Sequence, residues 1–271
     1  MIHRIAAAVA VAVSITFARP APSTKPGAVV AVGGGGTPDV AVREVMRLAG
    51  DGATVAVVPF ASSREDRGVG SVEMWNEAGA RAVLVDEDAT SARAALGSAD
   101  VIWMGGGNQD RLLDALEELD LVDLIRVRHA SGAVVGGTSA GAAVLGRISI
   151  AGRPDPDAYV RGAMEGRPAL DLVPDTIVDQ HFRERTREGR LLTAVLDAGG
   201  VLGLGISERT AAVVEGGSMR VLGDGVVVAF DARAAELAAK EGADPRYQVR
   251  GIATSILPPG AAWNLAAGRG K

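Results

Sequence analysis

The chain has 271 residues, of which 48% are hydrophobic and 23% charged, a balance typical of a globular protein and too apolar for intrinsic disorder. Its formal net charge of -5 and its few aromatic residues (four Phe, three Trp, two Tyr) disfavour a nucleic-acid partner, which needs basic patches and stacking platforms. The lack of cysteine excludes disulfides, thiolate zinc sites and cysteine nucleophiles, and leaves three histidines for other chemistry.

Residues 1–18 have the features of a secretory signal peptide. A basic start precedes the apolar run Ile5–Phe17, with Thr16 and Ala18 at the -3 and -1 positions of a cleavage site. The run is shorter than the roughly 20 residues of a membrane span, and a buried first strand is the alternative interpretation. A tether over 19–26 follows. We therefore expect a secreted or periplasmic protein with no membrane segment in its mature form.

From Gly27 onward, short Val-rich runs predict strands and the amphipathic stretches between them predict helices. The predicted strands are Ala28–Val32, Thr54–Pro59, Ala82–Val85, Val101–Met104 and Ala133–Val135, and the predicted helices are Asp39–Leu48, Val72–Ala78, Thr90–Leu96 and Gln109–Val127. This alternation predicts an α/β fold with a doubly wound, mostly parallel sheet covered on both faces.

After Gly200 the pattern changes to shorter strands. They are Val201–Ile206, Ala211–Val214, Met219–Leu222 and Val226–Phe230. We interpret them as a β-rich C-terminal completion of the same domain, because no linker, repeat or composition change separates them from the preceding part. The sequence thus predicts a single domain over 27–271.

Glycine clusters follow three predicted strands, at the strand ends where parallel sheets collect ligands. They are Gly33–Gly36, Gly105–Gly107 and Gly136–Gly137. The first lacks the Gly-Lys-Ser/Thr of a phosphate-binding loop and the spacing of a dinucleotide fingerprint. We interpret it as a tight strand-to-helix turn, with Thr37 as N-cap and Pro38 as the first helical residue.

Ser139 has the surroundings of a catalytic nucleophile. It lies at the centre of Gly-Thr-Ser-Ala-Gly over 137–141, after a predicted strand and before an Ala-rich helix over Ala142–Leu145. Small residues two positions away on each side permit the sharp turn that exposes a serine hydroxyl. The N–H groups at the start of the helix can stabilise an oxyanion. A structural turn is the alternative interpretation.

A nucleophilic serine needs a base and a group that orients it. His129 is expected to end a helix, which favours His181 as the base, with a surface histidine as the alternative. Glu208 follows a predicted strand and is an attractive acid, while Asp179 and Asp175 are its local competitors and an ordinary surface carboxylate is the alternative. The order Ser, His, Glu differs from that of the α/β-hydrolases and argues against an ordinary esterase.

Two further segments could bind substrate. Gly-Gly-Gly-Asn-Gln over 105–109 would let the backbone approach a substrate and supply a second oxyanion donor, or it simply forms a turn. Arginines crowd the segment after His181, which favours a substrate with carboxylates. A solvated helix with Glu–Arg pairs is the alternative. These arginines are Arg183, Arg185, Arg187 and Arg190.

Together these motifs resemble the cyanophycinase family, serine peptidases of the S51 group that are relatives of dipeptidase E and share a class I glutamine-amidotransferase-like, flavodoxin-like fold. The motifs are Gly-Gly-Gly-Asn-Gln at 105–109, Gly-Thr-Ser-Ala-Gly-Ala at 137–142, Asp-Gln-His-Phe followed by Arg-x-Arg-x-Gly-Arg-Leu at 179–191, and Gly-Leu-Gly-Ile-Ser-Glu-Arg-Thr-Ala at 203–211. The resemblance covers roughly 27–230.

The resemblance implies a triad of nucleophile Ser139, base His181 and acid Glu208, with Gly107 and Ala140 as oxyanion donors. Arg183 falls outside the family pattern and is expected at the surface, and the family glutamine corresponds to either Asn108 or Gln109. The residues implied to line the substrate pocket are Gln109, Asp179, Gln180, Arg185, Arg187 and Arg190.

Enzymes of this family release β-aspartyl-arginine dipeptides from cyanophycin, a polyaspartate chain with arginines on its β-carboxyls. We therefore expect a secreted serine peptidase that hydrolyses cyanophycin or other aspartyl-containing peptides through an acyl-enzyme, with no metal or organic cofactor. An exported esterase-type hydrolase and a catalytically inactive binding relative are the alternatives. The sequence does not determine the oligomeric state, and a homodimer is one possibility.

Overall fold

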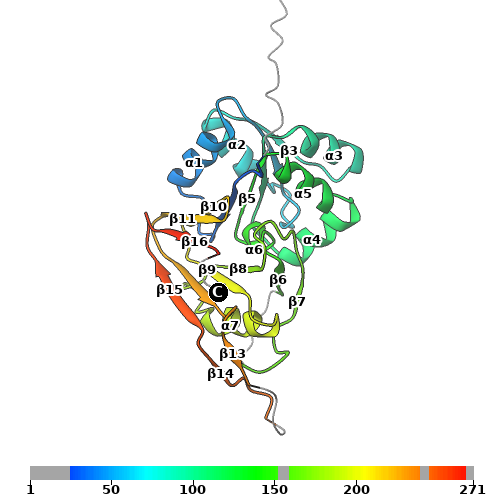
Figure 1. Ribbon diagram of the computed structural model, residues 1–271. Coiled ribbons are helices and arrows are strands. Elements are labelled where there is room, and N and C mark those ends of the chain that lie inside the picture. The colour runs from blue at the N-terminus through cyan, green and yellow to red at the C-terminus, as the bar shows by residue number, and fades with distance from the viewer. Residues whose placement is uncertain (1–24, 152–158, 239–243, 267–271) are drawn as a thin grey trace, which may run out of the picture.

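The computed structural model of the protein describes residues 25–151, 159–238 and 244–266. The expected signal peptide over 1–18 and most of the tether over 19–26 lie outside the described residues. Within the described ranges, seven α-helices accompany an eight-stranded sheet, a six-stranded sheet and a short two-stranded ladder (Figure 1). None of the helices in this part of the chain has the length and apolar character needed to cross a membrane.

The eight-stranded sheet contains the predicted parallel strands. The strands are β1 (Val29–Val32), β2 (Thr54–Val58), β3 (Arg81–Leu84), β4 (Val101–Met104), β5 (Val134–Thr138), β10 (Thr210–Glu215), β11 (Ser218–Gly223) and β16 (Ala262–Asn264). They lie in the order β16-β11-β10-β1-β5-β4-β2-β3. The five strands β1, β5, β4, β2 and β3 are parallel to their neighbours, and β10, β11 and β16 extend the sheet on the other side of β1 by antiparallel pairing. The strand that precedes Ser139, β5, is therefore central, between β1 and β4.

Helices cover both faces of this sheet, so the doubly wound α/β architecture is confirmed. The helices are α1 (Asp39–Ala49), α2 (Val69–Glu77), α3 (Ala89–Ser98), α4 (Gln109–Glu118), α5 (Val122–Ala130) and α6 (Ala140–Ala143). Alternate strand residues point to opposite faces: Val30 belongs to the cluster packed under α1 and α2, and Val29 to the cluster with α3 to α6. Burial on both faces explains why β1, β2 and β4 read as continuous apolar runs, whereas β3 at the edge of the sheet is largely exposed.

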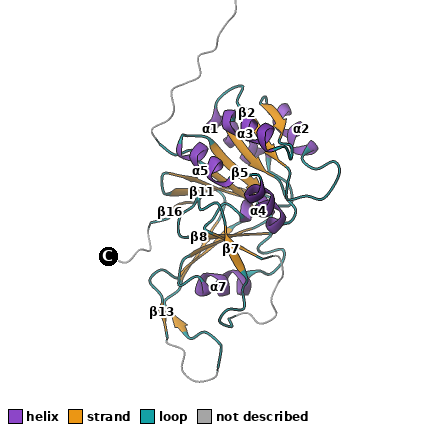
Figure 2. Cartoon of the chain, turned by 90° about the vertical axis from the view of Figure 1, so that its right-hand side faces the viewer, coloured by secondary structure: helices purple, strands orange, loops and turns teal. Residues whose placement is uncertain are grey.

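The strands after Gly200 extend the first sheet and also contribute to a second, six-stranded sheet. Its strands are β6 (Ile148–Ile150), β7 (Gly166–Pro168), β8 (Thr176–Gln180), β9 (Leu202–Ile206), β12 (Val227–Asp231) and β15 (Ala253–Leu257), in the order β15-β12-β9-β8-β6-β7. Helix α7 (Glu188–Asp197) packs on its outer side (Figure 2). The two-stranded ladder joins β13 (Glu236–Leu237) and β14 (Val249–Arg250).

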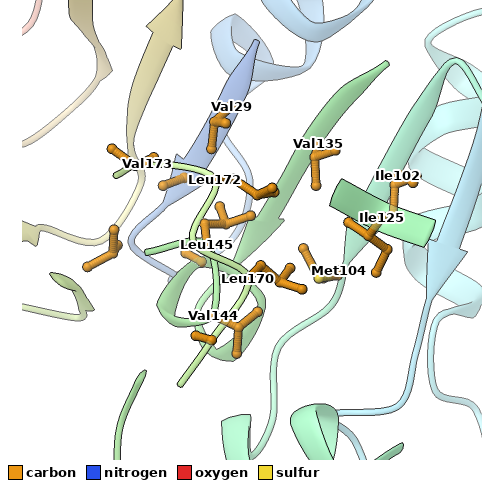
Figure 3. Packing of buried hydrophobic residues seen from close by; sticks show 14 of the residues in the cluster. Val29, Ile102, Met104, Ile125, Val135, Val144, Leu145, Leu170, Leu172 and Val173 are labelled. Atoms are coloured by element: carbon orange, nitrogen blue, oxygen red, sulfur yellow. The ribbon is translucent and has the colours of Figure 1, made fainter. Parts of the chain in front are cut away.

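One hydrophobic cluster joins the two sheets. Leu145, Leu170 and Leu172 gather beside Val29 and Val135 of the first sheet (Figure 3). The same cluster includes residues of β8, β9 and β12 in the second sheet. Because this core is shared, it fixes the position of the carboxyl ends of β8 and β9 relative to the end of β5.

Two predicted details are wrong. The helix expected over Gln109–Val127 is two helices, α4 and α5, because Asp120 between them has φ +54°, a left-handed backbone that ends α-helical hydrogen bonding. The cap expected for α1 is also wrong: the helix begins at Asp39, as predicted, but its N-cap is Pro38 and not Thr37, and no side-chain hydrogen bond caps it.

Candidate active site

Ser139 lies at the turn between β5 and α6, where the glycine pattern predicts a nucleophile. Its backbone has φ +54° and ψ -117°, a combination that residues with a Cβ rarely adopt. Flanking glycines make this turn sterically possible. A Cβ on Gly137 would lie 2.6 Å from the Gly141 backbone, and a Cβ on Gly141 would lie 2.2 Å from the Met104 carbonyl oxygen. The turn leaves the serine partly exposed beyond the end of the central strand.

Ser139, His181 and Glu208 form a continuous hydrogen-bonded chain. The Ser139 Oγ lies 2.9 Å from His181 Nε2, and His181 Nδ1 lies 2.5 Å from Glu208 Oε1. Because a carboxylate only accepts, Nδ1 carries the proton in this arrangement and Nε2 is left to accept the serine hydroxyl. The histidine side chain is 9% exposed and the glutamate 35%, so the chain runs from a buried imidazole to the surface.

These three residues come from both sheets. Ser139 follows β5 of the first sheet, His181 follows β8 and Glu208 follows β9 through Ser207. Strands β8 and β9 are parallel neighbours, so their carboxyl ends place the histidine and glutamate side by side. Parallel pairing within the second sheet and the core shared between the sheets therefore assemble the chain of hydrogen bonds.

The Gly33–Gly36 loop supports the histidine and the glutamate, a contact that sequence reasoning missed. The Gly33 carbonyl accepts the His181 N–H at 2.7 Å, and the Gly34 carbonyl accepts the N–H of the residue after Glu208 at 2.8 Å. A Cβ on Gly34 would lie 2.3 Å from the His181 ring, and a Cβ on Gly35 would lie 2.6 Å from Glu208 Oε2. Consecutive glycines after the strand next to β5 were the available signal, because such strand ends meet at one edge of the sheet.

The Gly105–Gly107 turn lies in front of Ser139. A Cβ on Gly106 would lie 3.3 Å from Ser139 Cβ. Gly107 has φ +146°, and a Cβ there would lie 2.1 Å from the Ala61 carbonyl oxygen, which accepts the N–H of Asn108 at 2.8 Å. The amides of Gly107 and of Ala140, the first residue of α6, donate to no backbone carbonyl of the described residues. Both N–H groups are therefore able to donate to a new acceptor such as an oxyanion.

Asp179, two residues before His181, is the centre of a buried charge cluster. Its side chain is 1% exposed and is contacted by Arg187 Nη1 at 3.1 Å and by Arg190 Nη2 and Nε, each at 3.2 Å. Arg187 Nη1 also donates to the Gln180 carbonyl at 2.8 Å. Burial lowers the pKa of Arg187 below its ordinary value, and the negative charge of Asp179 opposes that shift. The cluster thus joins β8 to the start of α7.

The remaining predicted substrate residues have different surroundings. Gln109 is buried and its Nε2 donates to the Ile150 carbonyl at 2.7 Å. Gln180 is also buried, and its Oε1 has no hydrogen-bond partner among the described residues. Arg185 is exposed on the turn after His181, and Arg183 is exposed as expected.

Glu184 is a second residue that the sequence reasoning did not single out. Its Oε2 accepts the backbone N–H of Glu208 at 3.1 Å, so it ties the loop that carries the acid to the turn that carries the base. It lies in a charged run of mixed sign, where no sequence signal separates it from its neighbours.

Residues 29–222 match the peptidase family S51. The chain belongs to this family. It is a serine-type peptidase, and its α/β fold agrees with that of its structural neighbours.

Among similar proteins, the cyanophycinase of Trichormus variabilis is 35% identical over 218 residues, which are 74% of this S51 peptidase and 73% of the relative. Peptidase E of Pasteurella multocida is 31% identical over 189 residues, 66% of this chain and 79% of that one. A crystal structure of a peptidase from an acI-B1 Actinobacterium has a TM-score of 0.64 at 20% identity, covering 89% of this chain and 98% of that chain.

The competing candidates lie elsewhere in this S51 peptidase. His129 is in the last turn of α5, before β5, so it lies at the opposite end of that strand from Ser139, and burial lowers its pKa. Asp175 precedes β8, at the opposite end of that strand from His181. In the described ranges, no group of three or more His, Asp or Glu side chains is arranged to hold a metal ion.

Proposed function

We propose that this peptidase hydrolyses aspartyl-containing peptides, cyanophycin among them, through the triad Ser139, His181 and Glu208. The observation that carries the proposal is the hydrogen-bonded chain from Ser139 Oγ through both imidazole nitrogens to Glu208 Oε1. That order of contacts is the one a general base needs to remove the serine proton while a carboxylate orients it.

In the proposed reaction, Ser139 Oγ attacks the scissile carbonyl carbon as His181 Nε2 takes the hydroxyl proton. Glu208 holds the proton on Nδ1 and stabilises the imidazolium that forms. The carbonyl oxygen becomes an oxyanion, for which the unpaired amides of Gly107 and Ala140 are suited donors. The imidazolium then gives its proton to the leaving amine, and water attacks the acyl-enzyme to release the acid and restore the serine.

Two observations support an aspartyl peptide as the substrate. Similar proteins include cyanophycinases at 35–36% identity. The turn after His181 also carries the exposed Arg185, and the Oε1 of the buried Gln180 has no partner in the part of the chain that the structure describes. An arginine on the turn that follows the base is suited to bind a substrate carboxylate, and an amide oxygen is suited to accept from a donor such as a substrate N–H. We propose that these two residues contact the substrate, together with Gln109.

We also propose that the protein is exported. The basic start, apolar run and Ala18 of the signal-peptide pattern support this, and removal of the segment would leave Arg19 as the first residue. N-terminal sequencing of the protein recovered from outside the cytoplasm tests it. A protein that keeps Met1 or stays in the cytoplasm contradicts export.

The substrate is tested by incubating the purified protein with cyanophycin, a panel of α- and β-aspartyl dipeptides and simple acyl esters, and identifying products by mass spectrometry. We expect β-aspartyl-arginine from cyanophycin and no activity in the Ser139→Ala variant. Hydrolysis of the esters without any aspartyl peptide would instead support the esterase-type alternative, and no turnover of any compound would support a binding relative.

A further inference from the structure

The backbone of His181 is held in an unusual conformation. Its φ is +48°, in the left-handed region that residues with a Cβ seldom occupy. Such conformations persist only where surrounding contacts enforce them, and they concentrate at functional sites. The contacts that enforce this one therefore bear on where the imidazole lies.

The peptide between Gln180 and His181 is fixed at both ends. Its N–H donates to the Gly33 carbonyl at 2.7 Å, and its carbonyl oxygen accepts from Arg187 Nη1 at 2.8 Å. The next peptide is held as well, because the Phe182 N–H donates to the Ile206 carbonyl at 3.1 Å. Of these contacts, the one from Arg187 is the only one made by a side chain.

Arg187 is itself anchored. Asp179 Oδ1 accepts from its Nη1 at 3.1 Å and also accepts the Gln180 N–H at 3.0 Å. Arg190 from α7 contacts both oxygens of the same carboxylate, Nη2 at Oδ1 and Nε at Oδ2. Both arginines are almost fully buried, where a charged pair is costly to desolvate and adds little net stability. Stability alone therefore does not account for the buried Arg187–Asp179 pair, whereas a role in holding the Gln180–His181 peptide does.

We propose that Arg187, anchored by Asp179, is a positioning residue for His181: it holds the Gln180–His181 peptide so that Nε2 stays within hydrogen-bond distance of Ser139 Oγ. This rests on the proposed function of Ser139 and His181. The Nη1 hydrogens of Arg187 are directed at Asp179 and at the Gln180 carbonyl, so this nitrogen serves the peptide and not a substrate. Positioning affects every reaction of Ser139, whereas a substrate contact affects only ligands with the matching charge.

The test uses a small, uncharged fluorophosphonate, which reacts with an activated serine and has no carboxylate for an arginine to bind. The variant Arg187→Lys keeps the charge but replaces Nη1, which donates to both the peptide and Asp179, with an ammonium on a shorter and more flexible stem. We expect its labelling rate at Ser139 to fall about 10- to 100-fold, the scale for a base displaced by up to 1 Å. For peptide hydrolysis, kcat should fall in parallel with little change in KM.

Arg183→Lys, an exposed position on the same turn, is the matched control and should label at the wild-type rate. Rates are measured well below each variant's midpoint of thermal unfolding, so a purely structural role lowers the midpoint without lowering the labelling rate. If Arg187→Lys does not fold, Asp179→Asn loosens the anchor with nearly unchanged shape, and a smaller fall in labelling is expected.

Wild-type labelling in the folded variant, with a raised KM for acidic peptides, would overturn the positioning role in favour of a substrate contact. A different result tests the proposed function: if the wild-type protein itself is not labelled at Ser139, the proposed function is wrong, and the positioning role of Arg187 is wrong with it.

Discussion

The contact between Gly34 and the imidazole gives a prediction that depends on geometry alone. In Gly34→Ala the new Cβ would lie 2.3 Å from the His181 ring, about 1 Å closer than ordinary van der Waals contact. The ring must therefore move by about that distance, which breaks the 2.9 Å contact between Nε2 and Ser139 Oγ. Misplacement of a reacting group by 1 Å costs about 100-fold in rate, and we expect a loss of that order in kcat.

The matched control is Gly36→Ala in the same loop. Gly36 also has a positive φ, +96° against +95° for Gly34, but a Cβ there meets nothing within 4 Å. Both variants carry the backbone strain of a left-handed alanine, about 1–2 kcal/mol. Only Gly34→Ala adds the clash with the ring, so its unfolding midpoint should fall at least as far as that of Gly36→Ala. The assay is kcat for peptide hydrolysis and the unfolding midpoint, measured on both variants. Equal kcat values in the two variants would refute the claim that this loop acts through the histidine ring.

Two further predictions follow from charges. Glu208→Gln should lower kcat by about 10⁴-fold, as expected when the group that fixes the histidine tautomer is neutralised. Asp179→Asn should lower kcat far less. Steady-state kinetics in which Asp179→Asn loses more kcat than Glu208→Gln would contradict the choice of Glu208 as the acid. Hydrogen bonds from Arg47 above all, and from Arg220, lower the pKa of Glu44 to about 2 from 4.5. The unfolded chain binds the proton first, so this stabilisation is present above pH 4.5 and is lost as the pH falls toward 2. In urea unfolding at pH 5 and pH 3, Glu44→Gln should lose less stability between the two pH values than the wild type does, and an identical loss would argue against the shift.

Strands β1, β2 and β4 were predictable from sequence because a strand buried on both faces has a continuous apolar run. Strand β4 was predicted at the residues where it occurs, and β1 and β2 each to within one residue. The turn at Ser139 was predictable for a different reason, since glycines two residues away are needed for its backbone. The break at Asp120 was not, because one left-handed residue within an amphipathic stretch leaves the apolar pattern intact.

Ser139, His181 and Glu208 could be singled out from the sequence as candidates, but their hydrogen-bonded arrangement could not. Scarcity of histidine directed attention to His181, and a strand end directed it to Glu208. That the two lie on a second sheet could not be read from the sequence, because β6 and β7 are only three residues long and carry no clear period. The packing of Gly34 on the imidazole and the Arg187 contact to the peptide before His181 depend on tertiary structure, and no local pattern indicates them.

The central claim is that His181 activates Ser139 as a nucleophile. The most direct measurement is peptide mapping by mass spectrometry after the folded protein reacts with a fluorophosphonate. The account predicts a single adduct at Ser139 in the wild type and its loss in His181→Ala with the fold retained. An adduct at another serine, no adduct, or undiminished labelling in His181→Ala would contradict it.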